Sequence, residues 1–295
     1  MPAPNEFLPV KIHHEVYPGI EPSKFVGTLK GKVVFITGAS RGIGEATAIA
    51  FAKSGASLFL ASRKQETLDQ VKSDIISAVP DVKVGTLTTD VEQHESVKAA
   101  VEGCVKEFGK IDVVISNSGT MEDFTQTIAQ RDPDVWWKTW EVNVKGSFNV
   151  AHYTLPELSK TKGYFIFVSS MGAQGRRVGA SAYQSGKHAI NRIAEFAAME
   201  TADDDVKVFS IHPGGVMTDL SKVAAKELAA VLIDDVQLPA WAMVRLVQGR
   251  DDYLSGRFVS VTWDLDELEE KWKDAIISED ALKNRLALPL AAQKA

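Results

Sequence analysis

The chain has little cysteine, little histidine and no excess of positive charge, and each scarcity excludes a class of protein. Cys104 is the only cysteine in 295 residues, which excludes a framework of intrachain disulfides and favours a reducing compartment, the cytoplasm. The six histidines lack the spacing of metal ligands, so no metal site is expected. With 33 basic and 39 acidic residues the net charge is −6, and no basic tract is present that would bind nucleic acid.

Long hydrophobic runs are missing as well. No stretch approaches the roughly 20 apolar residues that cross a bilayer, and the proline-punctuated first thirty residues contain no run of signal-peptide length. Hydrophobic residues nevertheless make up 45% of the chain and charged residues 24%, which is ordinary for a globular protein. We therefore expect a soluble intracellular protein without a membrane partner.

Short apolar runs rich in β-branched residues alternate with amphipathic stretches along most of the chain. The runs predict seven strands, near residues 33–36, 57–63, 83–91, 111–119, 163–170, 206–215 and 256–261. Helices are predicted after the glycine-rich turn that follows the first strand and over residues 64–78, 94–109, about 134–160 and 180–200. This alternation is typical of right-handed βαβ units and predicts an α/β fold with a doubly wound, mainly parallel sheet.

Both ends of the chain stand outside this alternation. Residues 1–29 are predicted to form an arm that packs along the surface of a single domain, residues 30–262. Residues 263–295 are predicted to form a helical tail on the same domain, because apolar side chains recur there at helical spacing. Those side chains are Leu265, Leu268, Trp272 and Ile276.

The stretch TGASRGIG joins the first predicted strand to a helix and places Gly38, Gly42 and Gly44 in the turn. Glycines at such a place allow a tight turn and a close backbone approach to a pyrophosphate, with the free N–H groups of the helix facing the anion. The spacing differs from the general G-x-G-x-x-G pattern, and an ordinary strand–helix connection is the alternative for the turn alone. Its position on the first strand of a long βα series favours a nucleotide site.

Further motifs follow the turn in a fixed order: Asp after the third strand, Asn-x-Gly after the fourth, Asn on the next helix, then Ser and Tyr-x-x-x-Lys. Over residues 31 to 262 this order resembles the short-chain dehydrogenase/reductase family, and the tail resembles a subset common among its fungal members. The resemblance implies one Rossmann-like domain with a seven-stranded sheet. It also implies an oxidoreductase that transfers a hydride between a nicotinamide cofactor and a carbonyl or secondary alcohol.

Four polar residues match the family's catalytic positions. Ser170 precedes Tyr183 by thirteen residues and Lys187 follows by four, one helical turn further on. The resemblance makes Tyr183 the acid/base, and its phenol, with an ordinary pKa near 10, needs a nearby positive charge such as Lys187. It also implies that Ser170 orients the substrate oxygen and that Lys187 binds the nicotinamide ribose. Asn143 would kink its helix and hold a water linked to Lys187.

The resemblance also implies a set of cofactor-binding residues at the carboxyl ends of the strands. They lie in the glycine turn, at the end of the second strand, in the segments after the third, fourth and sixth strands, and on the helix of the Tyr-x-x-x-Lys motif. The residues are Gly38, Ser40, Arg41, Gly42, Ile43, Gly44, Ser62, Arg63, Asp90, Val91, Asn117, Gly119, Tyr183, Lys187, Pro213, Gly214, Val216 and Thr218.

The end of the second strand predicts which nicotinamide cofactor is used. Ser62 stands where NAD-selective relatives carry an acidic residue, and Arg63 follows it directly. Arg41 would approach the same ribose, and two guanidiniums can bind a 2′-phosphate through charge-assisted hydrogen bonds. The sequence thus predicts NADP(H) as the cofactor. The alternative is that Arg63 merely begins the next helix as a solvated side chain.

Substrate and assembly are predicted from apolar side chains. Residues 216–235 occupy the place of a mobile lid, and Val216, Met217 and Leu220 favour a mostly apolar small molecule, although a buried amphipathic helix would look the same. The resemblance implies that the helices near 134–160 and 179–200 pack against a second copy, and the apolar stripe on the second helix agrees with this. A homodimer or homotetramer is therefore predicted. The stripe consists of Ala189, Ile193 and Phe196.

Two rival interpretations remain. A cofactor-binding regulatory protein of the same fold would be recognised by loss of Tyr183 or Lys187, and both residues are present. The extended branch of the family, with its dehydratases and epimerases, has a different glycine spacing and a larger C-terminal substrate domain. The oxidoreductase is therefore the favoured interpretation.

Overall fold

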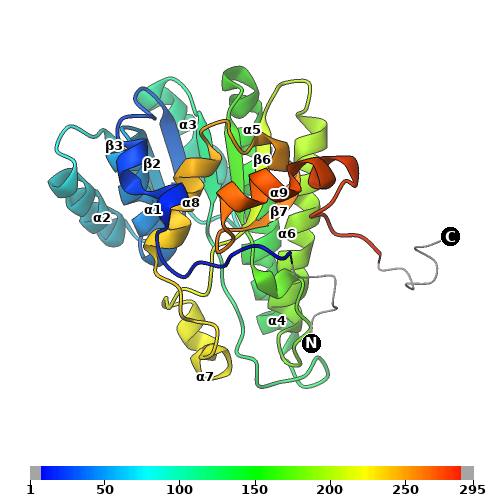
Figure 1. Ribbon diagram of the computed structural model, residues 1–295. Helices are drawn as coiled ribbons and strands as arrows, with labels where there is room; N and C mark the ends of the chain where they lie inside the picture. The colour runs from blue at the N-terminus through cyan, green and yellow to red at the C-terminus, as the bar shows by residue number, and fades with distance from the viewer. Residues whose placement is uncertain (1–7, 287–295) are drawn as a thin grey trace.

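A parallel sheet forms the centre of the structure, a computed structural model that describes residues 8–286 (Figure 1). The first seven residues of the predicted arm and the last nine of the predicted tail lie outside the described residues. Within the described range the sheet has seven strands in the order β3-β2-β1-β4-β5-β6-β7, which confirms the predicted fold class. The strands are β1 (Val33–Thr37), β2 (Ser57–Ser62), β3 (Val84–Thr88), β4 (Val113–Ser116), β5 (Tyr164–Val168), β6 (Lys207–His212) and β7 (Arg257–Ser260).

The strand order places a crevice beside β1. The chain runs outward from β1 to β2 and β3, then returns to the other side of β1 as β4. In register, Thr37 at the end of β1 pairs with both Ala61 and Ser116, so the carboxyl ends of β1, β2 and β4 are level. Ligands of doubly wound sheets bind at such a switch point, outside the carboxyl ends of the strands.

Helices cover both faces of the sheet and form two separate hydrophobic clusters (Figure 1). One cluster contains α1 (Gly42–Lys53), α2 (Gln65–Ala78), α8 (Gln237–Leu246) and α9 (Leu265–Ser278). The other contains α3 (His94–Phe108), α5 (Gly146–Thr161) and α6 (Ser181–Glu200). All five residues of β1 are buried, as expected for a strand covered on both faces.

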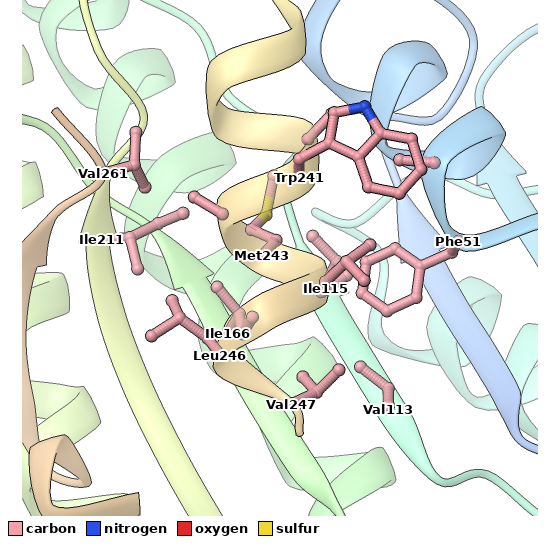
Figure 2. Close-up of a cluster of buried hydrophobic side chains, with 14 of the residues drawn as sticks. Phe51, Val113, Ile115, Ile166, Ile211, Trp241, Met243, Leu246, Val247 and Val261 are labelled. Carbon is pink, nitrogen blue, oxygen red and sulfur yellow. The ribbon is translucent and has the colours of Figure 1, made fainter. Parts of the chain in front are cut away.

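The helix α8 is an element that the sequence pattern does not predict. Its residues from Leu238 to Leu246 are all buried, so its sequence lacks the alternation of apolar and polar faces that marks a surface helix. Figure 2 shows Trp241 and Met243 of α8 in a cluster with Phe51 of α1 and Ile115 of β4. This helix therefore packs beside α1 on the same face of the sheet.

The helix predicted over residues 134–160 is divided in two. It consists of α4 (Pro133–Trp140), a π-helical turn (Glu141–Lys145) and α5. Single π-helical turns inside α-helices often occur at functional sites. Figure 1 shows α4 and the short α7 (Ala225–Leu228), which belongs to the segment 216–235, below the sheet.

The N-terminal arm pairs with the tail from the opposite end of the sequence. Ile12 forms an antiparallel bridge with Trp263, and the His13 amide donates to the Thr262 carbonyl at 2.7 Å. The Tyr17 hydroxyl donates to the Trp263 carbonyl at 3.2 Å. Figure 1 shows the arm, in dark blue, running beneath α8 and α9. Five short 3₁₀ turns occur in the described range: Pro18–Ile20, Pro22–Phe25, Met171–Ala173, Ser221–Ala224 and Asp252–Leu254.

A buried ion pair joins the arm, α8 and the tail. Arg245 of α8 is 2% exposed, and its Nε donates to Oδ2 of the fully buried Asp251 at 2.9 Å. Its Nη1 donates to Oδ1 of Asp266 in α9 at 2.7 Å and to the Gly19 carbonyl at 3.2 Å. One guanidinium thus holds three segments that are distant in sequence.

We predict that Arg245→Met lowers the free energy of unfolding by about 3–5 kcal/mol, because Asp251 would keep a buried charge without its partner. Arg250→Met is the matched control: Arg250 binds Asp266 and Glu269 but its side chain is 53% exposed. Loss of such exposed pairs should cost no more than about 1 kcal/mol. Urea denaturation measures both values, and an equal loss in the two variants would contradict the assignment.

Candidate active site

The glycine turn brings the ends of β1 and β4 and the start of α1 into close contact. Gly38 and Gly42 have φ angles of 63° and 58°, which side chains rarely tolerate. A Cβ atom on Gly44 would lie 2.2 Å from the Gly38 carbonyl oxygen, and one on Gly38 would lie 3.0 Å from backbone atoms of Ser118. The close contacts of the turn therefore require glycine at residues 38 and 44, where a side chain would not fit. The turn places the first N–H groups of α1, from Gly42 onward, where an anion can bind.

The predicted Asn-x-Gly motif fastens this turn to β4. The Thr37 hydroxyl accepts from the amides of Asn117 and Ser118 at 3.1 and 3.3 Å, and Asn117 Nδ2 donates to the Gly38 carbonyl at 3.0 Å. The Asn117 side chain thus holds the turn, which the sequence did not show. Gly119 lies at the centre of the site, because a Cβ there would be 3.2 Å from Asn143 Oδ1 and 3.7 Å from Lys187 Nζ.

Ser170, Tyr183 and Lys187 converge at the carboxyl end of β5. The Ser170 hydroxyl acts on the Tyr183 phenol, whose pKa it lowers, and accepts from the Gly172 amide at 2.9 Å. Lys187, one turn after Tyr183 on α6, is 4% exposed, and its Nζ donates to the Val168 carbonyl at 2.8 Å. The Nζ atom lies 5.7 Å from the centroid of the Tyr183 ring. The sequence spacing thus corresponds to one cluster.

Burial pushes both ionisable groups of this cluster toward their neutral forms. It raises the pKa of the Tyr183 phenol, an effect that the Ser170 hydrogen bond reduces and the Glu122 carboxylate increases. It also lowers the pKa of the Lys187 ammonium to about 8. The uncharged phenol, which can donate a proton, is therefore the favoured form in the protein alone.

Asn143 lies in the π-helical turn and is fully buried. Its Oδ1 accepts from the Thr120 amide and its Nδ2 donates to the Thr120 carbonyl, both at 2.8 Å. This double hydrogen bond ties the loop after β4 to the division between α4 and α5. The water that Asn143 is predicted to hold stays a prediction.

The last residue of β2 is Ser62, an uncharged residue. The Ser62 Oγ is buried and has no hydrogen-bond partner among the described residues, and Arg63 beside it is exposed. Arg41 points elsewhere: its Nη1 donates to Oδ2 of Asp219 in the segment 216–235 at 3.0 Å. Both side chains of that pair are largely exposed, at 66% and 48%, so the pair is weak.

The segment after β6 lies against the glycine turn. Pro213, Gly214 and Val216 are buried, and a Cβ on Gly42 would lie 3.2 Å from the Thr218 Cγ2. Asp234, at the other end of the lid segment, accepts from the Gly215 amide at 2.5 Å and binds His14 of the arm at 2.5 Å. The two ends of the segment are therefore held together at its base.

Asp90 and Val91 shape the turn between β3 and α3. Asp90 Oδ1 accepts from the Glu92 amide at 3.1 Å, which is the turn-capping role that a carboxylate at a strand end often has. Val91 is buried, and a Cβ on Gly146 would lie 2.7 Å from its Cγ2. The role in cofactor binding that the resemblance implies for Asp90 stays a prediction.

Glu122 is a buried site residue that sequence reasoning missed. It is 4% exposed, and its Oε1 accepts from the amides of Ala182 and Tyr183 at 3.0 and 3.1 Å. A cavity of about 410 Å³ lies beside it, lined by the loop residues Thr120 and Met121 and by Val135 and other residues of α4. The only available signal was an acidic residue three positions after the Asn-x-Gly motif.

Over residues 8–286, no group of three or more histidine, cysteine, aspartate or glutamate side chains is placed to hold a metal ion. None of the helices in that range is both long and apolar enough to cross a membrane.

The level strand ends, the glycine turn and the Ser–Tyr–Lys cluster are those of a Rossmann-type nucleotide-binding fold, and comparison with known proteins specifies the family. Residues 32–229 match the family model described as short chain dehydrogenase. The chain is 39% identical over 285 residues to the short chain dehydrogenase mpl6 of Monascus purpureus, covering 94% of this chain and 96% of that protein. The chain thus belongs to the short-chain dehydrogenase family, a family of oxidoreductases, and the resemblance inferred from its motifs is confirmed.

Solved structures show the same fold. Levodione reductase has a TM-score of 0.74 and 23% identity, over 79% of this chain and 97% of that one. The 3-ketoacyl-(acyl-carrier-protein) reductase of Brucella melitensis, complexed with NADH, has a TM-score of 0.73 and 25% identity, over 79% of this chain and 97% of that one. The core of the fold is therefore common to enzymes that act on different carbonyl compounds.

We predict that Gly44→Ala weakens cofactor binding at least tenfold, because the new Cβ would force the turn away from the Gly38 carbonyl oxygen. Gly103→Ala is the matched control, also a helical glycine, whose Cβ would meet its nearest neighbour, Phe59, at an ordinary 3.4 Å. That variant should bind normally and should be as stable as the wild type or slightly more so. Fluorescence titration with NADPH and with NADH measures the binding, and equal affinity in the two variants would contradict the role of the turn.

Proposed function

We propose that the protein is an NADP(H)-dependent oxidoreductase that interconverts a carbonyl group and a secondary alcohol in a mostly apolar small molecule. The observation that carries this proposal is the convergence of Ser170, Tyr183 and Lys187 beside the glycine turn. The geometry fits a nicotinamide cofactor, because the close packing at Gly38 and Gly44 makes a tight turn from which the first N–H groups of α1 would face a pyrophosphate. When bound, that cofactor would supply or accept the hydride.

The side chains of the cluster have separate roles in this proposal. Ser170 would hold the substrate oxygen, and in the reducing direction Tyr183 would donate its phenolic proton to that oxygen. Lys187 has three N–H donors, of which one is used on the Val168 carbonyl, so others remain for ribose hydroxyls. Its positive charge would stabilise the phenolate left after proton transfer. Asn143 would relay the replacing proton through a bound water.

The lid segment supports an apolar substrate. Met217, Val223, Val231 and Ile233 are each at least half exposed, which a buried amphipathic helix would not leave. The cavity beside Glu122 has a mixed lining, in which the charged side chains of Asp134 and Lys138 stand next to apolar ones such as Val135. We propose a substrate with an apolar body and at least one further polar group beside the reacting carbon.

We also propose a cytoplasmic homodimer or homotetramer without a nucleic-acid partner. Of the predicted apolar stripe, Phe196 is 53% exposed, whereas Ala189 and Ile193 are partly covered within the single chain. Trp137 of α4 and Phe148 of α5 are 58% and 54% exposed. These helices correspond to the surfaces predicted to meet a second copy. The lone Cys104 is a free, buried thiol, which is compatible with a reducing compartment.

We predict that Tyr183→Phe lowers kcat by about 10²–10⁴ while cofactor affinity stays within a few-fold, because only proton transfer is lost. Tyr153→Phe, which removes a hydroxyl bonded to His94, is the control and should keep full activity. Lys187→Ala should reduce both kcat and cofactor affinity. A panel of ketones and secondary alcohols, followed by cofactor absorbance, provides the assay. More than a tenth of the wild-type kcat in Tyr183→Phe would reject its role.

We predict that kcat/KM is higher with NADPH than with NADH, and that Ser62→Asp combined with Arg63→Ile removes most of this preference. A carboxylate at residue 62 would repel a 2′-phosphate, and each charge-assisted hydrogen bond lost is worth about 1.5–3 kcal/mol, roughly tenfold or more. Asp219→Asn is the control: it releases Arg41 from its exposed ion pair and should keep or increase the preference. Equal use of both cofactors by the wild type would refute the assignment.

A further inference from the structure

The helix that carries Tyr183 is capped by a carboxylate from another part of the chain. The first turn of any α-helix has N–H groups without partners in the helix, and the residue preceding it usually provides an acceptor. Here Ala180 precedes α6 and has no side-chain acceptor. Glu122, from the loop after β4, takes its place with Oε1 on the amides of Ala182 and Tyr183. The position of Tyr183 therefore depends directly on Glu122.

Capping alone does not require a charged residue. A glutamine has the same acceptor oxygen, whereas the second oxygen of Glu122, Oε2, is buried without a hydrogen-bond partner among the described residues. Burying an unsatisfied charged oxygen is costly. A buried carboxylate with one unpartnered oxygen beside a reacting group indicates a role in the reaction.

Charged and polar groups face Tyr183 from every side that packs against it. Lys187 lies on the same helix and Ser170 at the end of β5. Glu122 comes from the loop after β4, and Phe124 of that loop packs 6.5 Å from the Tyr183 ring. The guanidinium of Arg177 lies over the ring of Phe124, and its Nη1 donates to the Glu227 carbonyl. Glu122 is the one carboxylate whose charge acts on the phenol here, and it raises the pKa of Tyr183.

We propose that Glu122 is a positioning residue that caps α6 and whose negative charge keeps the Tyr183 phenol protonated, which suits the site to carbonyl reduction. The inference rests on the proposed function. In that direction the Tyr183 O–H bond breaks, its proton goes to the substrate oxygen, and the carbonyl carbon accepts a hydride from the reduced nicotinamide. The phenolate left behind is reprotonated from solvent. Oxidation of the alcohol needs the phenolate first and is therefore expected only at higher pH.

The test compares Glu122→Gln, which keeps the acceptor and removes the charge, with Glu122→Ala, which removes both. The pH at which kcat/KM for alcohol oxidation reaches half its plateau should fall by about one unit in Glu122→Gln, because the phenolate forms more readily. Glu122→Ala should show the same shift, together with a lower Tm and a roughly tenfold lower kcat. Glu200→Gln, an exposed carboxylate at the far end of α6, is the control and should leave the profile unchanged.

A second readout does not depend on turnover. The absorbance of tyrosinate, taken as the difference between each protein and its Tyr183→Phe counterpart, follows the ionisation of Tyr183 alone, and it should appear at lower pH in Glu122→Gln. Coincident titrations in wild type and Glu122→Gln would overturn the charge role, and equal losses of Tm in the two variants would overturn the cap. If no alcohol or ketone is turned over with either cofactor, the proposed function fails, and the titration still decides the role of Glu122.

Discussion

The carbonyl oxygen of Gly38 is the point on which the arrangement of the site depends. It accepts the Asn117 amide and occupies the space that a side chain on Gly44 would need. This oxygen belongs to the residue directly after β1. The start of α1 can pass beside it only with a glycine at residue 44, and the Asn117 hydrogen bond keeps the end of β4 level with the end of β1. The Thr218 side chain closes over the same turn, next to Gly42. One close backbone approach therefore aligns three loops that would otherwise vary independently.

Around Tyr183, by contrast, the arrangement depends on buried side chains that can carry a charge. Lys187 and Glu122 are both more than nine-tenths buried: Lys187 lies one turn after Tyr183 on α6, and Glu122, from the loop after β4, accepts from the Tyr183 amide. One charge favours the phenolate and the other favours the phenol. Such a pair is expensive in folding free energy, and the α/β core supplies the rigidity that keeps it in place. In the proposed function, burial and these two charges together would set the pH at which Tyr183 releases its proton.

The sequence predicts what is local or repeated, and misses what depends on distant contacts. Apolar runs correctly indicate the seven strands, because central strands such as β1 and β4 are buried along their whole length. The motif order correctly predicts the family. The all-buried α8 shows no amphipathic period. The residues of the π-helical turn at Asn143 suit an ordinary helix, so only the family resemblance indicated an irregularity there. The hydrogen bonds of Glu122 to α6 span about sixty residues, and the pairing of Ile12 with Trp263 spans the whole chain.

The position of α8 shows that the apolar interior extends beyond the residues that match the family model. The family match ends at residue 229, whereas α8 begins at Gln237 and its Trp241 and Met243 complete the layer over Phe51 (Figure 2). A fragment cut at the boundary of the match would expose that layer to water, together with the face of the sheet beneath it. It would also lose β7 and the partners of the arm. Residues 32–229 thus do not enclose their own apolar interior, which is completed by the part of the chain that the match leaves out.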